Sequence, residues 1–308
     1  MSLIPKKYAA LIHPNTLYTH RKPLLIGTAA LAAISPLLAY AWSSYQEWLT
    51  LGAGGVPYNI FGWLVQSSLH LVARDDVRDP VPKPHASAAD LARAYHYGPA
   101  AQTSYVSASS SSTLVTKTTT GSLRRRAGPR PEVPGFVAPQ RQTTDWAAGP
   151  DIVTLQKQFL ALLNDANPTT FALAQSGLEG PRHDALYLRP SATTTTTTTN
   201  TKLLLGRASG NEWAHVHGEG SAHVTLSPVD AAAAIEAGWA ERHPLSGVGG
   251  GYAMVPWGYV MLYAPRNEDE YAVWVELVLA AARYVAFAGA ERDVVPVSAE
   301  DRSTDIVV

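Results

Sequence analysis

Cysteine is absent from this chain of 308 residues. Its absence excludes disulfides, thiol nucleophiles, and zinc or iron–sulfur sites that depend on cysteine ligands. Any metal ion would have to be held by histidine and carboxylate side chains. The absence does not identify a compartment, because secreted and intracellular proteins can both lack disulfides.

The sequence also lacks an excess of charge of either sign. Lys+Arg 24 stand against Asp+Glu 25, which gives a formal net charge of −1. Nucleic-acid binders carry a basic patch that attracts phosphates, and this balance does not indicate one. We therefore expect no nucleic acid among the partners. A usable Asn-x-Ser/Thr glycosylation site is missing too, because Asn167 is followed by Pro168.

A long apolar run near the N-terminus predicts a membrane anchor. Residues 23–42 (PLLIGTAALAAISPLLAYAW) contain no charged residue and have the length of a membrane span. Basic residues precede the run, namely Lys6, Lys7, Arg21 and Lys22. They favour a cytoplasmic N-terminus. We interpret residues 1–50 as a tail and a single-pass transmembrane helix, and we expect the endomembrane system. A signal peptide and a buried helix are the alternatives.

A second apolar stretch, residues 56–73, lies in the membrane-proximal region 51–100. Phe61, Leu64 and Val65 recur at helical spacing, which predicts a helix resting at the membrane interface. If this stretch crosses the bilayer instead, it forms a hairpin with the first span. The side of the membrane on which the C-terminal domain lies therefore stays open.

Low-complexity tracts divide the remaining chain. Residues 101–150 are rich in Ser and Thr and then in Pro and Arg, which predicts an extended linker. A threonine run within 191–201 predicts a flexible insertion, and residues 291–308 a flexible tail. Between linker and tail, residues 151–290 form the predicted globular domain.

Local signals within this domain indicate both helices and strands. Asp151 is expected to cap a helix that ends near Asn167. Residues 185–188 and 203–205 are typical of short strands, and residues 239–247 of a loop.

Residues 213–226 have the pattern of a β-hairpin that gathers histidines. Alternation places Trp213, His215 and His217 on one face of the first strand. A loop with an odd number of residues, with Gly220 at positive φ, places His223 on that face, opposite His217. Three imidazoles would then share one surface.

The end of the domain has clear helix and strand signals. Ser227 and Pro228 open a helix that Gly238 ends, and Asn267 caps a final helix. Residues 256–263 (PWGYVMLY) between them favour a strand. We expect an α+β fold, an antiparallel sheet with helices packed on one face, preceded by the transmembrane helix.

Several of these segments together resemble the fungal luciferase family. They are AHVH at 214–217, the strand around His223, GWAERHPLSG at 238–247 and LYAPRNEDE at 262–270. The likeness covers about a quarter of the chain well, and the apolar N-terminal segment extends it loosely. It implies a membrane-associated oxygenase, without a bound cofactor, that adds dioxygen to a 3-hydroxy-α-pyrone or related aromatic polyketide. The turn between His217 and His223 is shorter than in luminous members, so we expect no light.

This chemistry needs a base, a cation for the enolate and a dry pocket. The candidate catalytic residues are His215, His217, His223 and His243. Side chains that could bind a flat anionic substrate are Trp213, Trp239, Arg242, Trp257, Tyr263 and Arg266.

Other interpretations of the same residues remain open. Arg266 could instead tie a loop to a carboxylate, and His243 could cap a turn. His215, His217 and His223 could ligate zinc or iron, with Glu212, Glu219 or Glu241 as the fourth ligand. A third alternative is a non-catalytic, membrane-tethered module that binds a small molecule or serves as a scaffold. The substrate and the oligomeric state do not follow from the sequence.

Overall fold

A computed structural model describes residues 21–106, 123–147, 149–189 and 204–298 of the chain. The threonine insertion, most of the Ser/Thr tract and the end of the tail lie outside these residues. The chain divides into two compact units, Met1–Thr50 and Leu51–Val308.

The first unit contains one long helix, α3 (Arg21–Thr50), with Pro36 inside it. Four of its described apolar side chains, at Leu25, Ile26, Leu37 and Leu38, are between 64% and 70% exposed. The predicted span at 23–42 therefore lies on a helix. Several of its side chains fall outside the described residues, and its place in a membrane stays a prediction.

The second unit is an α+β fold built on a six-stranded sheet with the order β1-β2-β3-β4-β6-β5. All neighbouring strands are antiparallel. The strands are β1 (Phe171–Ser176), β2 (Gly180–Leu188), β3 (Glu212–Val216), β4 (Ala222–Thr225), β5 (Ala240–Arg242) and β6 (Tyr259–Leu262). The fold class predicted for this domain is thereby confirmed.

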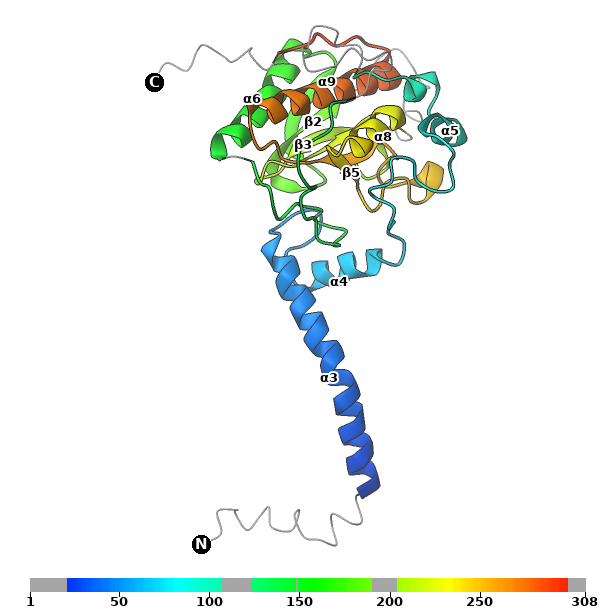
Figure 1. The fold of residues 1–308 in the computed structure, drawn as a ribbon, viewed down its shortest axis with the longest axis vertical. Helices are drawn as coiled ribbons and strands as arrows, with labels where there is room; N and C mark the ends of the chain where they lie inside the picture. The colour runs from blue at the N-terminus through cyan, green and yellow to red at the C-terminus, as the bar shows by residue number, and fades with distance from the viewer. Residues whose placement is uncertain (1–20, 107–122, 148, 190–203, 299–308) are drawn as a thin grey trace. The chain divides into compact units, whose positions relative to one another are not determined.

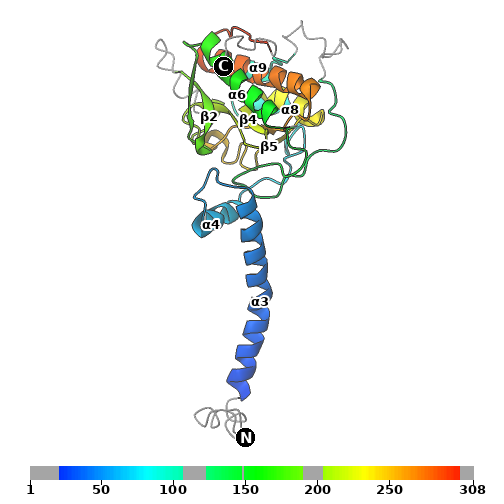
Figure 2. The same cartoon turned by 90° about the vertical axis from the view of Figure 1, so that its left-hand side faces the viewer.

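Helices cover one face of this sheet. Figures 1 and 2 show α6 (Pro150–Ala166), α8 (Pro228–Glu236) and α9 (Glu268–Ala290) on the same side of the strands. Shorter helical elements are α4 (Ile60–Leu69), α5 (Ala88–Ala94), η2 (Pro99–Gln102) and η3 (Gly250–Tyr252).

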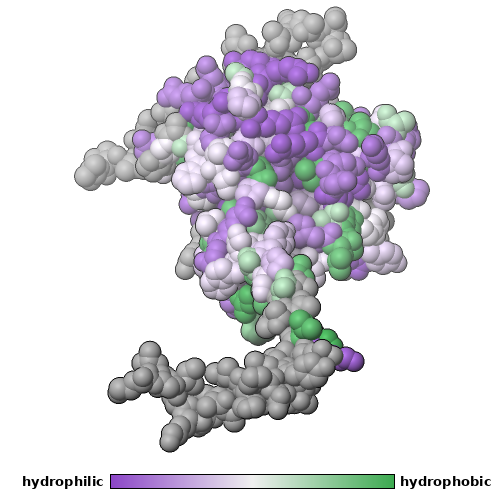
Figure 3. Space-filling model, turned by 60° about the horizontal axis from the view of Figure 1, so that its bottom comes forward, coloured by the Kyte–Doolittle hydropathy of each residue, from purple (hydrophilic) through white to green (hydrophobic). Residues whose placement is uncertain are grey.

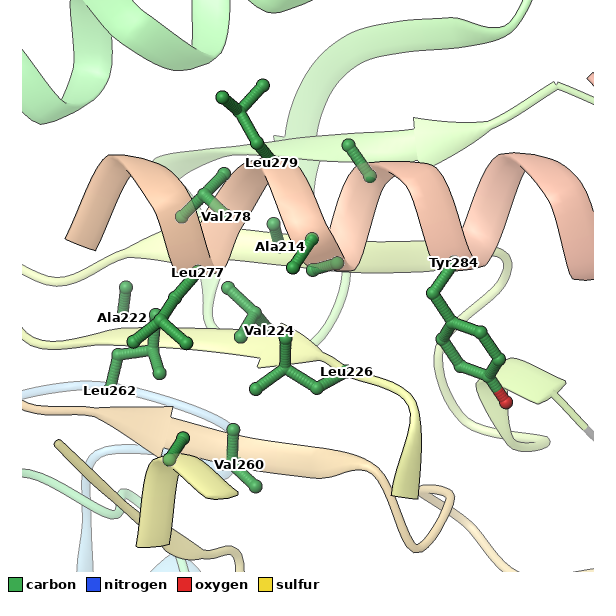
Figure 4. Close-up of a cluster of buried hydrophobic side chains, with 14 of the residues drawn as sticks. Ala214, Ala222, Val224, Leu226, Val260, Leu262, Leu277, Val278, Leu279 and Tyr284 are labelled. Carbon is green, nitrogen blue, oxygen red and sulfur yellow. The ribbon is translucent and has the colours of Figure 1, made fainter. Parts of the chain in front are cut away.

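The main core lies between the sheet and α9. Ala214, Val224 and Leu262 point from the strands toward Leu277 and Val278 of the helix (Figure 4). These strand residues alternate with the histidines, so burying the apolar face directs the imidazoles to the opposite face. Among the helices whose side chains are described throughout, α9 is the one that is long and apolar enough to cross a membrane. Since 78% of its apolar window is buried, it is a core helix.

Helix caps follow the sequence signals in two of three cases. Ser227 Oγ accepts a hydrogen bond from Asp230 N at 3.1 Å, and Asn267 Oδ1 accepts one from Glu270 N at 2.9 Å. The expected cap at Asp151 is wrong. Gly149 is the N-cap of α6, and Asp151 lies in the first turn, because Pro150 occupies the position that tolerates a missing N–H.

Two assignments of short segments are wrong as well. Leu204 and Leu205 lie in a helical turn rather than a strand and are buried in the core. Residues 240–242, expected in a loop, form β5 and pair with β6. Their partner strand supplies hydrogen bonds that no local pattern of three residues reveals.

The segment 123–147 also differs from the expected linker. It has no helix or strand, but Val137, Gln140 and Gln142 are buried. Gln142 Oε1 accepts a hydrogen bond from Ala264 N at 2.8 Å. The segment therefore belongs to the globular unit, because its buried polar groups find partners on the sheet.

Helix α4 turns its apolar side chains outward. Phe61 is 71% exposed, whereas Gln66 faces inward and accepts a hydrogen bond from Val137 N at 3.3 Å. Other exposed apolar residues here are Ile60, Leu64, Val65, Leu71 and Val72. Figure 3 shows apolar side chains gathered in separate patches among polar ones on one face of the molecule.

Candidate functional site

The predicted histidines converge on one face of the β3–β4 hairpin. His215 pairs with His223 in the register, and the ring centroids of His215, His217 and His223 lie 4.8 to 5.1 Å apart. The expected odd-numbered loop is present, with Gly220 at φ +96°. The expected pairing of His217 with His223 is wrong, because His217 N donates to Ser221 O at 2.8 Å. The observed register differs from the expected one by two residues. Because side chains alternate between the two faces of a strand, an even shift leaves the three histidines on the same face.

This histidine face is buried although it lies away from the helices. His215, His217 and His223 are each at most 1% exposed. A second apolar cluster, made of Val137, Leu245, Val255 and Tyr259, lies on this side. The ring of Tyr259 stacks on that of His223, with centroids 4.9 Å apart. The imidazoles are therefore shielded from bulk water.

A carboxylate that the sequence did not reveal completes the cluster. Glu179 lies in the turn between β1 and β2, and its Oε1 is 3.6 Å from His217 Nε2 and 3.8 Å from His215 Nε2. One atom from each of Glu179, His215, His217 and His223 falls within 4.8 Å of all the others. These four residues are called the histidine cluster below. Arg141 Nη2 donates to Glu179 Oε2 at 2.7 Å.

Each imidazole of the cluster has a polar partner on its outer nitrogen. His215 Nδ1 lies 2.6 Å from Glu212 Oε1, and His217 Nδ1 lies 2.8 Å from Ser221 Oγ. His223 Nε2 lies 3.1 Å from Gln140 Oε1. Such outer partners orient an imidazole and select its tautomer.

The buried groups perturb one another's titration. Burial lowers the pKa of His215, but hydrogen bonds and charges from Glu179 and Glu212 outweigh it and raise the pKa to about 9. Burial and the positive charges of His217 and His215 hold the pKa of His223 well below its usual range. Burial raises the pKa of Glu179, yet hydrogen bonds from His215 and His217 bring it well below normal. A positive charge is thus favoured on His215 and disfavoured on His223.

His243, the fourth predicted catalytic residue, lies at the edge of the cluster. Its ring centroid is 5.5 Å from that of His223. Its Nδ1 also accepts a hydrogen bond from Leu245 N at 3.1 Å, so it caps the turn as the alternative interpretation held. Burial lowers the pKa of His243 to about 4.

Trp213 does not lie on the histidine face, contrary to the expected alternation. A register shift between Leu186 and Tyr187 of β2 makes Trp213 an extra residue in β3. Its ring packs in the core against Phe171, with centroids 5.1 Å apart. The same bulge turns Glu212 toward His215.

The two predicted arginines are held away from the histidine cluster. Arg242 is buried and donates to the backbone oxygens of Asp79 and Pro80, the latter at 2.7 Å. Arg266 forms an ion pair with Glu270, which matches the alternative that it ties a loop to a carboxylate. The structure therefore does not bring either guanidinium group beside the histidines, and substrate binding by these arginines stays a prediction.

The remaining predicted aromatic residues also lie elsewhere. Trp239 Nε1 donates to Arg124 O at 2.6 Å, and the Tyr263 hydroxyl donates to Glu241 Oε2 at 3.0 Å. Trp257 lines a cavity of about 660 Å³, where the Arg74 guanidinium lies 4.4 Å from the centre of its ring.

A second cavity, of about 410 Å³, is separated from the histidine cluster by Gln140, and none of the four cluster residues lines it. Its wall contains Gln140, which contacts His223, and Glu241, whose Oε1 accepts from Gln140 Nε2 at 3.0 Å. Other lining residues include Arg74, Arg78, Val133 and Phe136. Its volume is in the range of small-molecule sites. We call it the Gln140 cavity.

Residues 210–281 match the Luciferase domain. A luciferase from Armillaria mellea is 24% identical over 268 residues, which are 82% of this chain and 85% of that protein. A luciferase from Armillaria gallica is 33% identical over 100 residues, 32% of this chain and 36% of that protein. One from Neonothopanus nambi is 38% identical over 77 residues, 24% of this chain and 28% of that protein. No solved structure matches the chain. The chain is thus a relative of the fungal luciferases.

Proposed function

We propose that this relative of the fungal luciferases is a membrane-anchored oxygenase that acts on a hydroxy-α-pyrone or a related aromatic polyketide, with dioxygen as co-substrate. The observation that carries the proposal is the buried histidine cluster, which lies largely within the matched domain. Its His223 is hydrogen-bonded to Gln140, a wall residue of a cavity of about 410 Å³.

The geometry suits the activation of an enol. A hydroxypyrone must lose its enol proton before it is electron-rich enough to react with dioxygen, and the anion then needs a positive charge nearby. The cluster supplies imidazoles in surroundings that exclude water. On the cavity side, Phe136 offers an apolar wall. Arg74 and Arg78 also line the cavity with their guanidinium groups, which are ion-paired with Asp76 and Glu241 and would have to bind the substrate anion beside these carboxylates. We assign substrate binding to these residues instead of Arg242 and Arg266.

This chemistry needs no flavin, haem or nucleotide, because the substrate enolate itself supplies the electrons. We further propose that the reaction emits no light. The stretch between His217 and His223 is short and contains no further histidine.

The test is a screen of the detergent-solubilised full chain against hydroxypyrones and catechols, with an oxygen electrode, mass spectrometry and a luminometer. We expect oxygen uptake with a hydroxypyrone, and a product that has gained dioxygen and lost carbon dioxide, at background luminescence. Binding of hydroxypyrones without oxygen uptake would instead support the non-catalytic module. If they neither bind nor react, the proposed substrate class is wrong.

Membrane attachment rests on α3 and α4. The exposed Ile34, Leu37 and Leu38 would face lipid in a span at 23–42, and the outward apolar face of α4 would rest at the interface. We expect the Leu37→Asp, Leu38→Asp double variant to move into the soluble fraction after a carbonate wash, because each buried charge costs about 3 kcal/mol in the bilayer.

Gln46→Asp is the matched control, because Gln46 is exposed on the same helix beyond the apolar run. This variant should stay in the membrane pellet with the wild type. Extraction of the wild-type chain by carbonate would contradict the anchor.

A further inference from the structure

In the histidine cluster, the inward-facing ring nitrogens of the neutral imidazoles carry lone pairs that point toward one another. The hydrogen-bond partners of the outer ring nitrogens show this. His215 Nδ1 faces the Glu212 carboxylate at 2.6 Å. A carboxylate only accepts hydrogen bonds, so this nitrogen carries the ring proton. In the neutral imidazole, His215 Nε2 then holds a free electron pair, and it points into the cluster.

His217 has the same arrangement. Its Nδ1 contacts Ser221 Oγ, and the Ser221 hydroxyl donates its one proton to Glu219 Oε1. The serine oxygen is therefore left to accept, so His217 carries its proton on Nδ1. Its Nε2 lies 3.2 Å from His215 Nε2 with a second electron pair.

In His223 the outer nitrogen is Nε2 and the inward nitrogen is Nδ1, the reverse of the other two rings. Its inward nitrogen nevertheless also carries a lone pair. Gln140 Nε2 donates to Glu241 Oε1 at 3.0 Å and to Arg242 O at 3.1 Å, which fixes the orientation of the amide. Gln140 Oε1 must then accept from His223 Nε2. His223 Nδ1 is left with a free electron pair, 3.2 Å from His215 Nε2.

The inward atoms have the spacing of ligands around one metal ion. Of the six pairs among the three nitrogens and Glu179 Oε1, four are separated by 3.2, 3.2, 3.6 and 3.8 Å, and all six lie within 4.8 Å. Tetrahedral ligands at the usual bond lengths of about 2.0–2.2 Å lie about 3.3–3.6 Å apart. A proton on one nitrogen would turn one of these lone-pair contacts into a hydrogen bond. A metal ion would accept all four lone pairs at once.

The charges around the cluster agree with a divalent ion. Three carboxylates contact it, those of Glu179, Glu212 and Glu219, against one guanidinium, that of Arg141, within the described part of the chain. With the imidazoles neutral, as they are when they bind a metal ion, this leaves two negative charges for a cation to balance. The partners Glu212, Ser221 and Gln140 are also of the kind that orient metal-bound imidazoles.

We infer that Glu179, His215, His217 and His223 form a binding site for a divalent first-row transition metal ion of the zinc, iron or manganese class. The imidazole-rich ligand set disfavours calcium and magnesium, which prefer oxygen ligands. The inference concerns metal binding alone and stands apart from the proposed substrate. If the ion also takes part in oxygenation, it is the positive charge that the enolate requires.

The test measures the metal bound to the full chain in detergent. The chain is treated with chelator, dialysed, and loaded anaerobically with Zn²⁺, Fe²⁺, Mn²⁺ or Mg²⁺. We expect about one equivalent of a transition metal ion by mass spectrometry and a rise in Tm on loading, because a ligand of the native state stabilises it. Magnesium should not shift the Tm.

Two variants and a control make the result specific. Glu179→Gln keeps the shape of the side chain and should lower metal affinity at least ~10-fold, and His217→Ala should lower it further. His183→Ala is the control, since His183 hydrogen-bonds Val216 O and does not belong to the four ligand atoms. It should bind like the wild type. Circular dichroism confirms that each variant is folded.

The inference is overturned if the folded wild type retains less than about a tenth of an equivalent, well below the stoichiometry of a structural or catalytic site, and none of the transition metal ions shifts its Tm. Equal affinity in Glu179→Gln and the wild type would also overturn the assigned ligand set. A loaded but inactive enzyme would leave the metal site standing and remove only the proposed oxygenase function.

Discussion

Replacement of His217 by alanine is expected to lower kcat/KM for hydroxypyrone-dependent oxygen uptake at least ~100-fold. His217 is fully buried, and its Nε2 lies between His215 Nε2 and Glu179 Oε1, at 3.2 and 3.6 Å. Its removal opens a hole in the centre of the cluster and takes away either a proton acceptor or a ligand. The measurement is steady-state oxygen consumption by the detergent-solubilised chain.

The control for this prediction is again His183→Ala. The His183 ring lies 6.2 Å from that of His217, but its Nδ1 contacts only a backbone oxygen in the described part of the chain. Oxygen uptake should therefore stay within about twofold of the wild type, as for a substitution outside the reacting groups. If His217→Ala keeps full activity while remaining folded, the cluster is not the catalytic site.

Replacement of Gly258 by alanine is expected to destabilise the globular unit by about 3 kcal/mol or more. A Cβ at this position would lie 1.9 Å from Leu226 O, a backbone atom that cannot move aside as a side chain can. Leu226 N donates to Gly258 O at 2.9 Å, so the two chains are held together just where β4 ends and β6 begins. Strain there must separate the central strands. We expect Tm to fall by about 6 °C or more.

Gly251→Ala is the matched control, since a Cβ there meets nothing within 4 Å and its φ is not positive. Its Tm should lie within about 2 °C of the wild type, as for an unstrained surface substitution. Thermal unfolding followed by circular dichroism compares the three proteins. A Gly258→Ala variant as stable as Gly251→Ala would show that β4 and β6 can separate without cost, contrary to their close packing.

In the histidine hairpin, the local sequence pattern predicted the shared face of the histidines but not the bulge. Alternation predicted that His215, His217 and His223 share a face, and the odd-numbered loop kept that parity although the register differed by two residues. Trp213 is the bulge residue of the same strand, and alternation wrongly assigned it to the histidine face. A bulge depends on how β3 meets β2, and this pairing leaves no mark in the sequence of β3 itself.

The residues that contact the histidines could not be predicted from the local sequence pattern. Glu179 precedes β2 in a polar hairpin turn, and Gln140 lies in a segment rich in proline that was expected to be a linker. Neither position has a periodicity that distinguishes it from a solvated surface residue. Each lies beside an imidazole only because chain segments distant in the sequence fold onto the same side of the sheet.

By itself, the sequence determined the class of fold, the caps of the last two helices, the shared face of three histidines and the likeness to fungal luciferases. These depend on residues close together in the chain, where alternation, capping and motif spacing act directly. Only the tertiary structure decided which carboxylate joins the histidines, which groups contact their outer nitrogens and which cavity lies beside their partner Gln140. Those features arise from contacts between residues far apart in the sequence, such as His223 with Gln140, 83 positions apart, and Gln140 with Arg242, 102 positions apart. The folded sheet and its covering segments bring these residues together.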